Sequence, residues 1–326
     1  EWLLEFWAAF GPTRAGKAPG AYLVERVRTL AQQLWTNTTV RTVGSYATGL
    51  YLPTSDVDIM VIDTAGRMDK ATAIRKLHEL RDALEERVAW QVTDIEVIDK
   101  ARVPIIKFVD ARTGLPVDIT FESDSGLRSS ALGRKAARQF SPFKYLVLLL
   151  KRWLQERSLH DTFSGGVGSF LLQLLVISSL QHPPRPTRTK GAAGNLGALL
   201  IHFFEVFGLR LNYPAVGLSV ADGGTFFRKA ARGWHSEERS WLLSVENPLE
   251  RSNEPWPAGD VGANAYNIRA VRRALGHSYV SILDACAAAR EPQAGARPRL
   301  RVLSAVLDVE EEMARRFKLH AQEAVE

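Results

Sequence analysis

Cysteine is almost missing from this sequence, and its scarcity limits the metal sites that the chain can build. Of the 326 residues only Cys286 is a cysteine, and the seven histidines are scattered. One cysteine cannot form a disulfide within the chain, and no cysteine and histidine spacing matches a zinc site. Any catalytic metal must therefore be held by oxygen ligands, which indicates magnesium or manganese.

Long hydrophobic runs are also missing. The apolar stretches at residues 145–150 and 170–180 are shorter than the ~18 residues that a membrane span requires. We therefore expect buried helices there and no membrane partner. The sequence starts at Glu1 without a methionine or a cleavable leader pattern, so we expect a trimmed chain from which targeting signals cannot be read.

What is present is typical of a globular protein with a basic surface. Hydrophobic residues make up 46% and charged residues 24% of the chain, and its formal net charge is +6. A basic balance suits a polyanionic partner such as nucleic acid or nucleotide. The length is sufficient for two domains.

The two parts of the chain differ in hydrophobic pattern. Helices are predicted at 2–10, 21–34 and 70–87, and strands at 39–43, 57–62, 91–98, 105–110 and 116–121. Later in the chain helical periodicity dominates, at 143–157, 168–180, 195–207, 268–289 and 300–321. We therefore predict an α+β fold with a domain junction near residues 129–140.

Acidic residues stand in or next to two of the predicted strands. Asp56 and Asp58 are two positions apart, so strand geometry places both on one face. Asp118 is the acidic residue of an otherwise apolar strand. Buried carboxylates are costly without a cation, and three of them can share the divalent ions of a two-metal site. We predict that all three are catalytic residues and ligands of Mg²⁺ or Mn²⁺.

A glycine and a serine precede the aspartate pair. Gly44 allows close approach of backbone N–H groups to phosphate, and the hydroxyl of Ser45 can donate a hydrogen bond. Alone, the Gly-Ser pair is an ordinary turn, and the aspartate pair is equally a solvated strand end or a helix cap. Their combination with Asp118 favours nucleotidyl transfer.

The stretch from Gly44 to Asp58, Gly-Ser-Tyr-Ala-Thr-Gly-Leu-Tyr-Leu-Pro-Thr-Ser-Asp-Val-Asp, closely resembles the catalytic motif of non-canonical poly(A) polymerases. These belong to the DNA polymerase β-like nucleotidyltransferase superfamily. Further similar stretches extend the resemblance over nearly the whole chain, at 101–107, 117–119, 150–151, 162–170, 212–213, 222–224, 246–249 and 260–262. The resemblance is strongest to the nuclear, exosome-cofactor (TRAMP-like) subtype.

The resemblance implies a fold and an activity. The fold is a mixed-sheet nucleotidyltransferase catalytic domain over residues 20–130 and a mostly helical central, PAP-associated domain over 1–19 and 131–326, with nucleotide in the cleft between them. The activity is template-independent addition of AMP from ATP to RNA 3′ ends with two Mg²⁺ ions, tagging nuclear RNA for processing or decay. The implied partners are an RNA helicase and a zinc-knuckle RNA-binding protein, and the implied location is the nucleus.

The resemblance also implies nucleotide-binding residues beyond Gly44. It implies that Ser45 and Lys151 hold the triphosphate and that Ser169 makes a further phosphate contact. It also implies that Phe170 stacks on the base and that Ser129 or Ser130 faces the ribose. Ordinary alternatives remain, because a lysine can simply cap a surface helix and an aromatic residue at helical spacing is usually core.

The base-reading segment departs from the family. Residues 254–259 look inserted, so Asn247, Asn253 and Asp260 are each candidates for contact with the base edge. No histidine lies where uridylyl-transferring relatives often carry one, which favours ATP over UTP, and Ala263 stands where many relatives carry arginine.

Three alternatives stay open from the sequence. A terminal uridylyltransferase shares the whole catalytic apparatus. A catalytically inactive RNA-binding or scaffold homologue shares the fold, although the intact acidic triad argues against it. A nucleotidyltransferase of small molecules shares the Gly-Ser pair and the aspartates, but does not need the long helical half.

Overall fold

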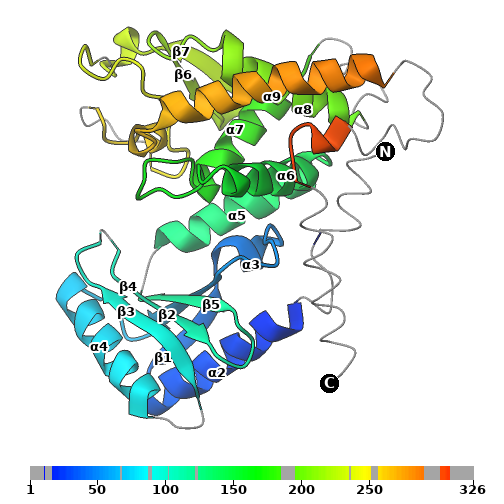
Figure 1. Ribbon diagram of the computed structural model, residues 1–326. Coiled ribbons are helices and arrows are strands. Elements are labelled where there is room, and N and C mark those ends of the chain that lie inside the picture. The colour runs from blue at the N-terminus through cyan, green and yellow to red at the C-terminus, as the bar shows by residue number, and fades with distance from the viewer. Residues whose placement is uncertain are drawn as a thin grey trace. The chain divides into compact units, whose positions relative to one another are not determined.

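The computed structural model describes Gly11 and residues 17–66, 68–86, 90–101, 103–121, 124–184, 195–234, 236–250, 256–289 and 302–308. The chain divides into two compact units between Lys135 and Ala136, inside helix α5 (Asp124–Gln139) (Figure 1). The sequence pattern did not predict this helix. The helix predicted at 2–10, and most of that at 300–321, lies outside the described residues.

The N-terminal unit is built on a five-stranded mixed sheet, as predicted. Its strands lie in the order β1-β2-β5-β4-β3, and each bound agrees with the prediction to within one residue: β1 (Thr38–Thr42), β2 (Val57–Asp63), β3 (Val92–Ile98), β4 (Ile105–Asp110) and β5 (Pro116–Phe121). The pair β2–β5 is parallel, whereas the other neighbours are antiparallel. A parallel pair requires a crossover, which here contains helix α4 (Lys70–Glu86) and the β3–β4 pair.

One face of the sheet forms a hydrophobic core with helices α2 (Ala18–Leu34) and α4. The strands contribute alternate positions to it: Val57, Ile59, Val61, Ile106, Phe108, Val117, Ile119 and Phe121. Because successive side chains of a strand point to opposite faces, the positions between them lie on the other face. Those positions include Asp58, Lys107 and Asp118.

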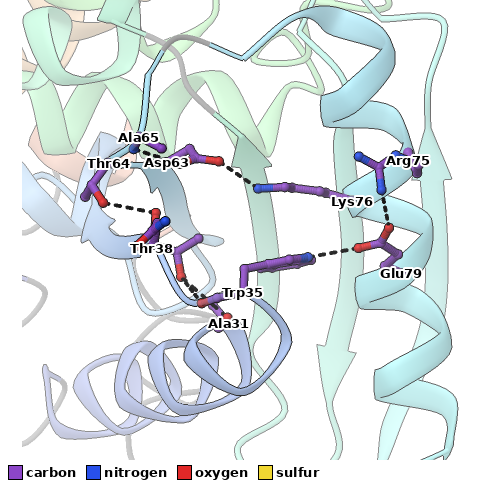
Figure 2. Close-up of polar contacts among 10 residues, drawn as sticks. Ala31, Trp35, Thr38, Asp63, Thr64, Ala65, Arg75, Lys76 and Glu79 are labelled. Atoms are coloured by element: carbon purple, nitrogen blue, oxygen red, sulfur yellow. Dashed lines mark hydrogen bonds and ion pairs between the residues drawn. The ribbon is translucent and has the colours of Figure 1, made fainter.

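Polar contacts join the helices to the sheet beside this core (Figure 2). The indole N–H of Trp35 donates to Glu79 Oε2 at 2.9 Å, and Lys76 Nζ donates to Asp63 Oδ2 at 2.9 Å. The backbone N–H of Ala65 and then the Lys76 ammonium lower the pKa of Asp63. These contacts tie α4 to the end of α2 and to the end of β2.

The C-terminal unit is mostly helical. Its longer helices are α6 (Phe143–Glu156), α7 (Ser169–Gln181), α8 (Leu196–Glu205) and α9 (Ile268–Ala288). A π-helical turn η4 (Val206–Arg210) continues α8. The antiparallel pair β6 (Val216–Ser219) and β7 (Thr225–Arg228) was not predicted, because four-residue strands are too short to give a clear alternation. The α+β fold is confirmed, and none of the described helices is both long and apolar enough to cross a membrane.

Candidate active site

Three charged residues lie side by side across adjacent strands of the sheet. Asp58 of β2 is in register with Asp118 of β5, and Asp118 is in register with Lys107 of β4. The alternation of the core places all three on the face opposite α2 and α4. Asp56 is exposed and lies immediately before β2. The sheet therefore brings together the three aspartates that the sequence predicted, although Asp118 is far from the pair along the chain.

Lys107 is ion-paired with the buried member of the triad. Its Nζ lies 2.6 Å from Asp118 Oδ2, and Asp118 is only 9% exposed. Burial raises the pKa of Asp118, while the hydrogen bond and charge of Lys107 oppose this rise and the charge of Asp56 adds to it. Burial lowers the pKa of Lys107, but Asp118, Asp56 and Asp58 outweigh that effect and raise it. Lys107 and the three aspartates thus form one electrostatic cluster.

Gly44 brings the backbone against the carboxylate of Asp58. Its φ is +62°, a left-handed conformation, and a Cβ at this position would lie 2.1 Å from Asp58 Oδ2. The backbone N–H of the preceding Val43 donates to the carbonyl of Asp58 at 3.0 Å. Glycine is therefore required both by the backbone conformation and by the approach of the carboxylate.

The loop between Gly44 and Asp56 is held by its own side chains. The rings of Tyr46 and Tyr51 stack with centroids 4.2 Å apart, and burial, with the charges of Tyr51 and Asp56, raises the pKa of Tyr46 to about 12. Ser55 Oγ accepts from the Leu52 backbone N–H at 2.9 Å. Gly44 and Asp56 are thus positioned by a packed loop.

Ser130 has a structural role that the sequence did not predict. It is 3% exposed, its hydroxyl accepts from the Gly44 N–H at 2.9 Å, and it donates to the Gly126 carbonyl at 2.8 Å. Ser130 therefore joins α5 to the Gly44 turn, and its contact with the ribose stays a prediction. It also occupies the Gly44 N–H, so an approach to phosphate is left to the following residue, Ser45. Ser129, half-buried and donating to the same carbonyl at 3.1 Å, is the other predicted ribose residue.

The donor set suits a hard divalent cation, since carboxylate oxygens are the ligands that magnesium and manganese prefer. The carboxylates are not gathered around one point, however. Among the described residues no three His, Cys, Asp or Glu side chains are close enough together to hold a metal as they stand. The Asp58 carboxylate lies against Gly44 and that of Asp118 against Lys107, an arrangement that limits the mutual repulsion of the cluster.

Other predicted nucleotide contacts belong to the helical unit. Lys151 is half-buried in α6, Ser169 is exposed as the first residue of α7, and Phe170 is half-buried directly after it. The prediction that they meet a nucleotide with the aspartates stays a prediction.

Asp260 is a structural clamp. It is 6% exposed, its Oδ1 accepts from the N–H groups of Val245 and Gly262 at 2.8 and 2.9 Å, and its Oδ2 accepts from the Trp256 indole at 2.8 Å. Burial raises its pKa, and these hydrogen bonds oppose the rise. These hydrogen bonds give Asp260 a structural role in its loop, and its contact with the base stays a prediction.

Asn247 and Asn253 are the two asparagines predicted to contact the base. Asn247 is half-buried, and its Oδ1 accepts from the Leu249 N–H at 3.0 Å in a local turn. Asn253 lies outside the described residues. The identity of the base-reading side chain therefore stays a prediction.

Lys107 is the residue of the cluster to which the sequence analysis assigned no role. In β4, Lys107 is flanked by apolar residues up to Asp110. In β5, Asp118 is likewise flanked by apolar residues. Opposite charges that stand singly in two consecutive apolar strands are a recognisable sign of a cross-strand pair.

The mixed sheet and its acidic cluster agree with the nucleotidyltransferase fold expected from the sequence, and comparison with known proteins identifies the family. Residues 2–134 match the family model described as poly(A) RNA polymerase, mitochondrial-like, central palm domain. Residues 195–253 match the model described as Cid1 family poly A polymerase. The chain belongs to the non-canonical poly(A) polymerases of the nucleotidyltransferase superfamily.

Individual relatives agree with this family. The poly(A) RNA polymerase CID14 of Cryptococcus neoformans is 35% identical over 84% of this chain and 35% of its own length. The solved polymerase core of TRAMP, described as an RNA surveillance complex, is 28% identical with a TM-score of 0.80, over 94% of this chain and 92% of that one. An inactive relative, Trf4-2 of Drosophila melanogaster, is 32% identical over 79% of this chain and 62% of its own length. The chain spans from about a third to about half of the first curated relatives.

Proposed function

We propose that this chain transfers AMP from ATP to the 3′ end of RNA without a template. The observation that carries the proposal is the row of Asp58, Asp118 and Lys107 across three adjacent strands, with Gly44 against the first carboxylate. Such a row suits phosphoryl transfer, in which catalysis is mostly positioning and charge stabilisation.

Asp56, Asp58 and Asp118 would hold two Mg²⁺ ions. When bound, the ions supply activation of the attacking 3′-hydroxyl and neutralise charge on the phosphates. The protein's own residues would orient the reactants: Ser45, which follows Gly44, would contact the triphosphate, and Asp118 would accept the proton of the primer hydroxyl. Lys151, Ser169 and Phe170 are proposed to complete the phosphate and base contacts.

The substrate and partners extend the proposal. We infer that the chain tags nuclear RNA for processing or decay and works with an RNA helicase and a zinc-knuckle RNA-binding protein. The net charge of +6 supports an RNA substrate. The TRAMP core and the named poly(A) polymerases among its relatives support the complex and the choice of ATP.

Primer extension tests the activity. A labelled oligoribonucleotide is incubated with the chain, Mg²⁺ and each nucleoside triphosphate in turn, with Asp118→Asn as the inactive control. Extension with ATP in preference to the others is expected. Preference for UTP would show a terminal uridylyltransferase. Absence of extension with every nucleotide would favour an inactive homologue, a class that exists among the relatives.

A further inference from the structure

The Asp118 carboxylate is paired with the positively charged side chain of Lys107. The Lys107 ammonium lies 2.6 Å from Asp118 Oδ2, a close contact of the kind made by a charge-assisted hydrogen bond. The two residues are directly opposite each other on β4 and β5, so the pair is fixed by backbone register as well as by charge. Lys107 is therefore built into the same row as the metal ligands.

The position of this ammonium matters because Asp118 is the buried member of the triad. Asp118 is 9% exposed, and a buried carboxylate without a partner is destabilising. The Lys107 side chain is 41% exposed, so its ammonium can leave the carboxylate for solvent at modest cost. The ion pair therefore stabilises the Asp118 carboxylate, and another cation can replace the ammonium.

A divalent ion bound by Asp118 would lie close to the Lys107 ammonium, which contacts Oδ2 of the same carboxylate. Two cations close to one carboxylate repel each other, and in a partly buried site this repulsion is weakly screened. Asp118 cannot therefore retain its close pair with Lys107 and bind a metal through the same oxygen at full strength.

We propose that Lys107 is a positioning residue: an internal counter-cation that holds Asp118 through Oδ2 until a divalent metal binds and displaces the ammonium from that oxygen. The proposal rests on the metal site of the proposed function. It predicts that loss of Lys107 strengthens metal binding, the opposite of what loss of a ligand does.

Manganese binding tests the proposal directly. Free Mn²⁺ is measured by electron paramagnetic resonance during titration of the nucleotide-free chain, so the measurement does not depend on turnover. Lys107→Met should bind Mn²⁺ on the order of tenfold more tightly than the wild type, because one neighbouring positive charge is gone. Lys107→Gln should change affinity in the same direction, whereas Lys107→Arg should not bind more tightly than the wild type.

Thermal unfolding gives a second readout and a matched control. Without metal, Lys107→Met should unfold at a lower temperature than the wild type. Saturating Mn²⁺ should raise the unfolding temperature of Lys107→Met by more than it raises that of the wild type. Lys76→Met is the control, since Lys76 is also ion-paired at 2.9 Å, with Asp63, but belongs to α4 on the opposite face. It should lower stability and leave Mn²⁺ affinity unchanged.

The outcomes separate this proposal from the one on which it rests. If Asp118→Asn loses Mn²⁺ binding while Lys107→Met binds as the wild type does, or more weakly, the counter-cation role is wrong and the metal site stands. If the nucleotide-free wild type binds no Mn²⁺, the counter-cation role is overturned, while primer extension with Mg²⁺ still decides the proposed function. Tighter binding by Lys107→Met together with a lowered kcat supports the positioning role.

Discussion

Substitution of Gly44 by alanine tests how the site is positioned. A Cβ at this residue would lie 2.1 Å from Asp58 Oδ2 and 2.7 Å from its Cγ, so the carboxylate has to move. The side chain can swing away, and the main cost to stability is the left-handed backbone at φ +62°, about 1–2 kcal/mol for a residue with a Cβ. A catalytic carboxylate misplaced by about 1 Å costs on the order of a hundredfold in rate.

Gly49→Ala is the matched control for this substitution. Gly49 lies directly after the same short helix α3 (Gly44–Thr48), with φ +69° and nothing within 4 Å of its added Cβ. Both variants should lose a similar free energy of unfolding in urea titrations. Only Gly44→Ala should lose primer extension, about a hundredfold in kcat. Equal activity of the two variants would refute the argument that Gly44 sets the position of Asp58.

Three further predictions concern residues that support the site or the helical unit. Ser130→Ala should cost about 1–2 kcal/mol in urea unfolding, since it leaves the Gly44 N–H without its partner, whereas Ser129→Ala should cost under about 0.5 kcal/mol. Asp260→Ala should cost about 3 kcal/mol, because it deprives three donors of their acceptor; an unchanged stability would contradict the clamp. Burial lowers the pKa of His202 from 6.5, so the unfolded chain takes up its proton first. Stability should fall as pH drops below 6.5 toward the lowered pKa, and His202→Gln should flatten this dependence in thermal unfolding.

The sheet and its acidic residues could be predicted because local pattern determines them. Strand periodicity assigned Asp58 and Asp118 each to one face of its own strand. Acidic residues that stand alone in apolar strands indicated a metal site. Which strands become neighbours depends on the crossover between β2 and β5, and single-sequence periodicity carries no information on it. The resemblance to a known family implied a mixed sheet, and the order of its strands comes from the structure.

The roles of Ser130 and Asp260 could not be predicted for a related reason. Both side chains hydrogen-bond to backbone groups that are distant in sequence or belong to irregular loops, Gly44 in one case and Val245 in the other. Serine and aspartate serve equally well as ligand contacts and as loop ties. Only the three-dimensional arrangement distinguishes the two uses.

The parallel pairing of β2 with β5 has a consequence for how the protein matures. Asp58 and Asp118 are neighbours in the sheet, although α4 and the β3–β4 pair lie between them in the sequence. Long-range pairings of this kind form late, because the closure entropy of the intervening segment comes first. A metal that binds only the finished sheet would shift the folding equilibrium toward it. Formation of the β2–β5 pair therefore also forms the row of Asp58 and Asp118 that is proposed to bind the metal.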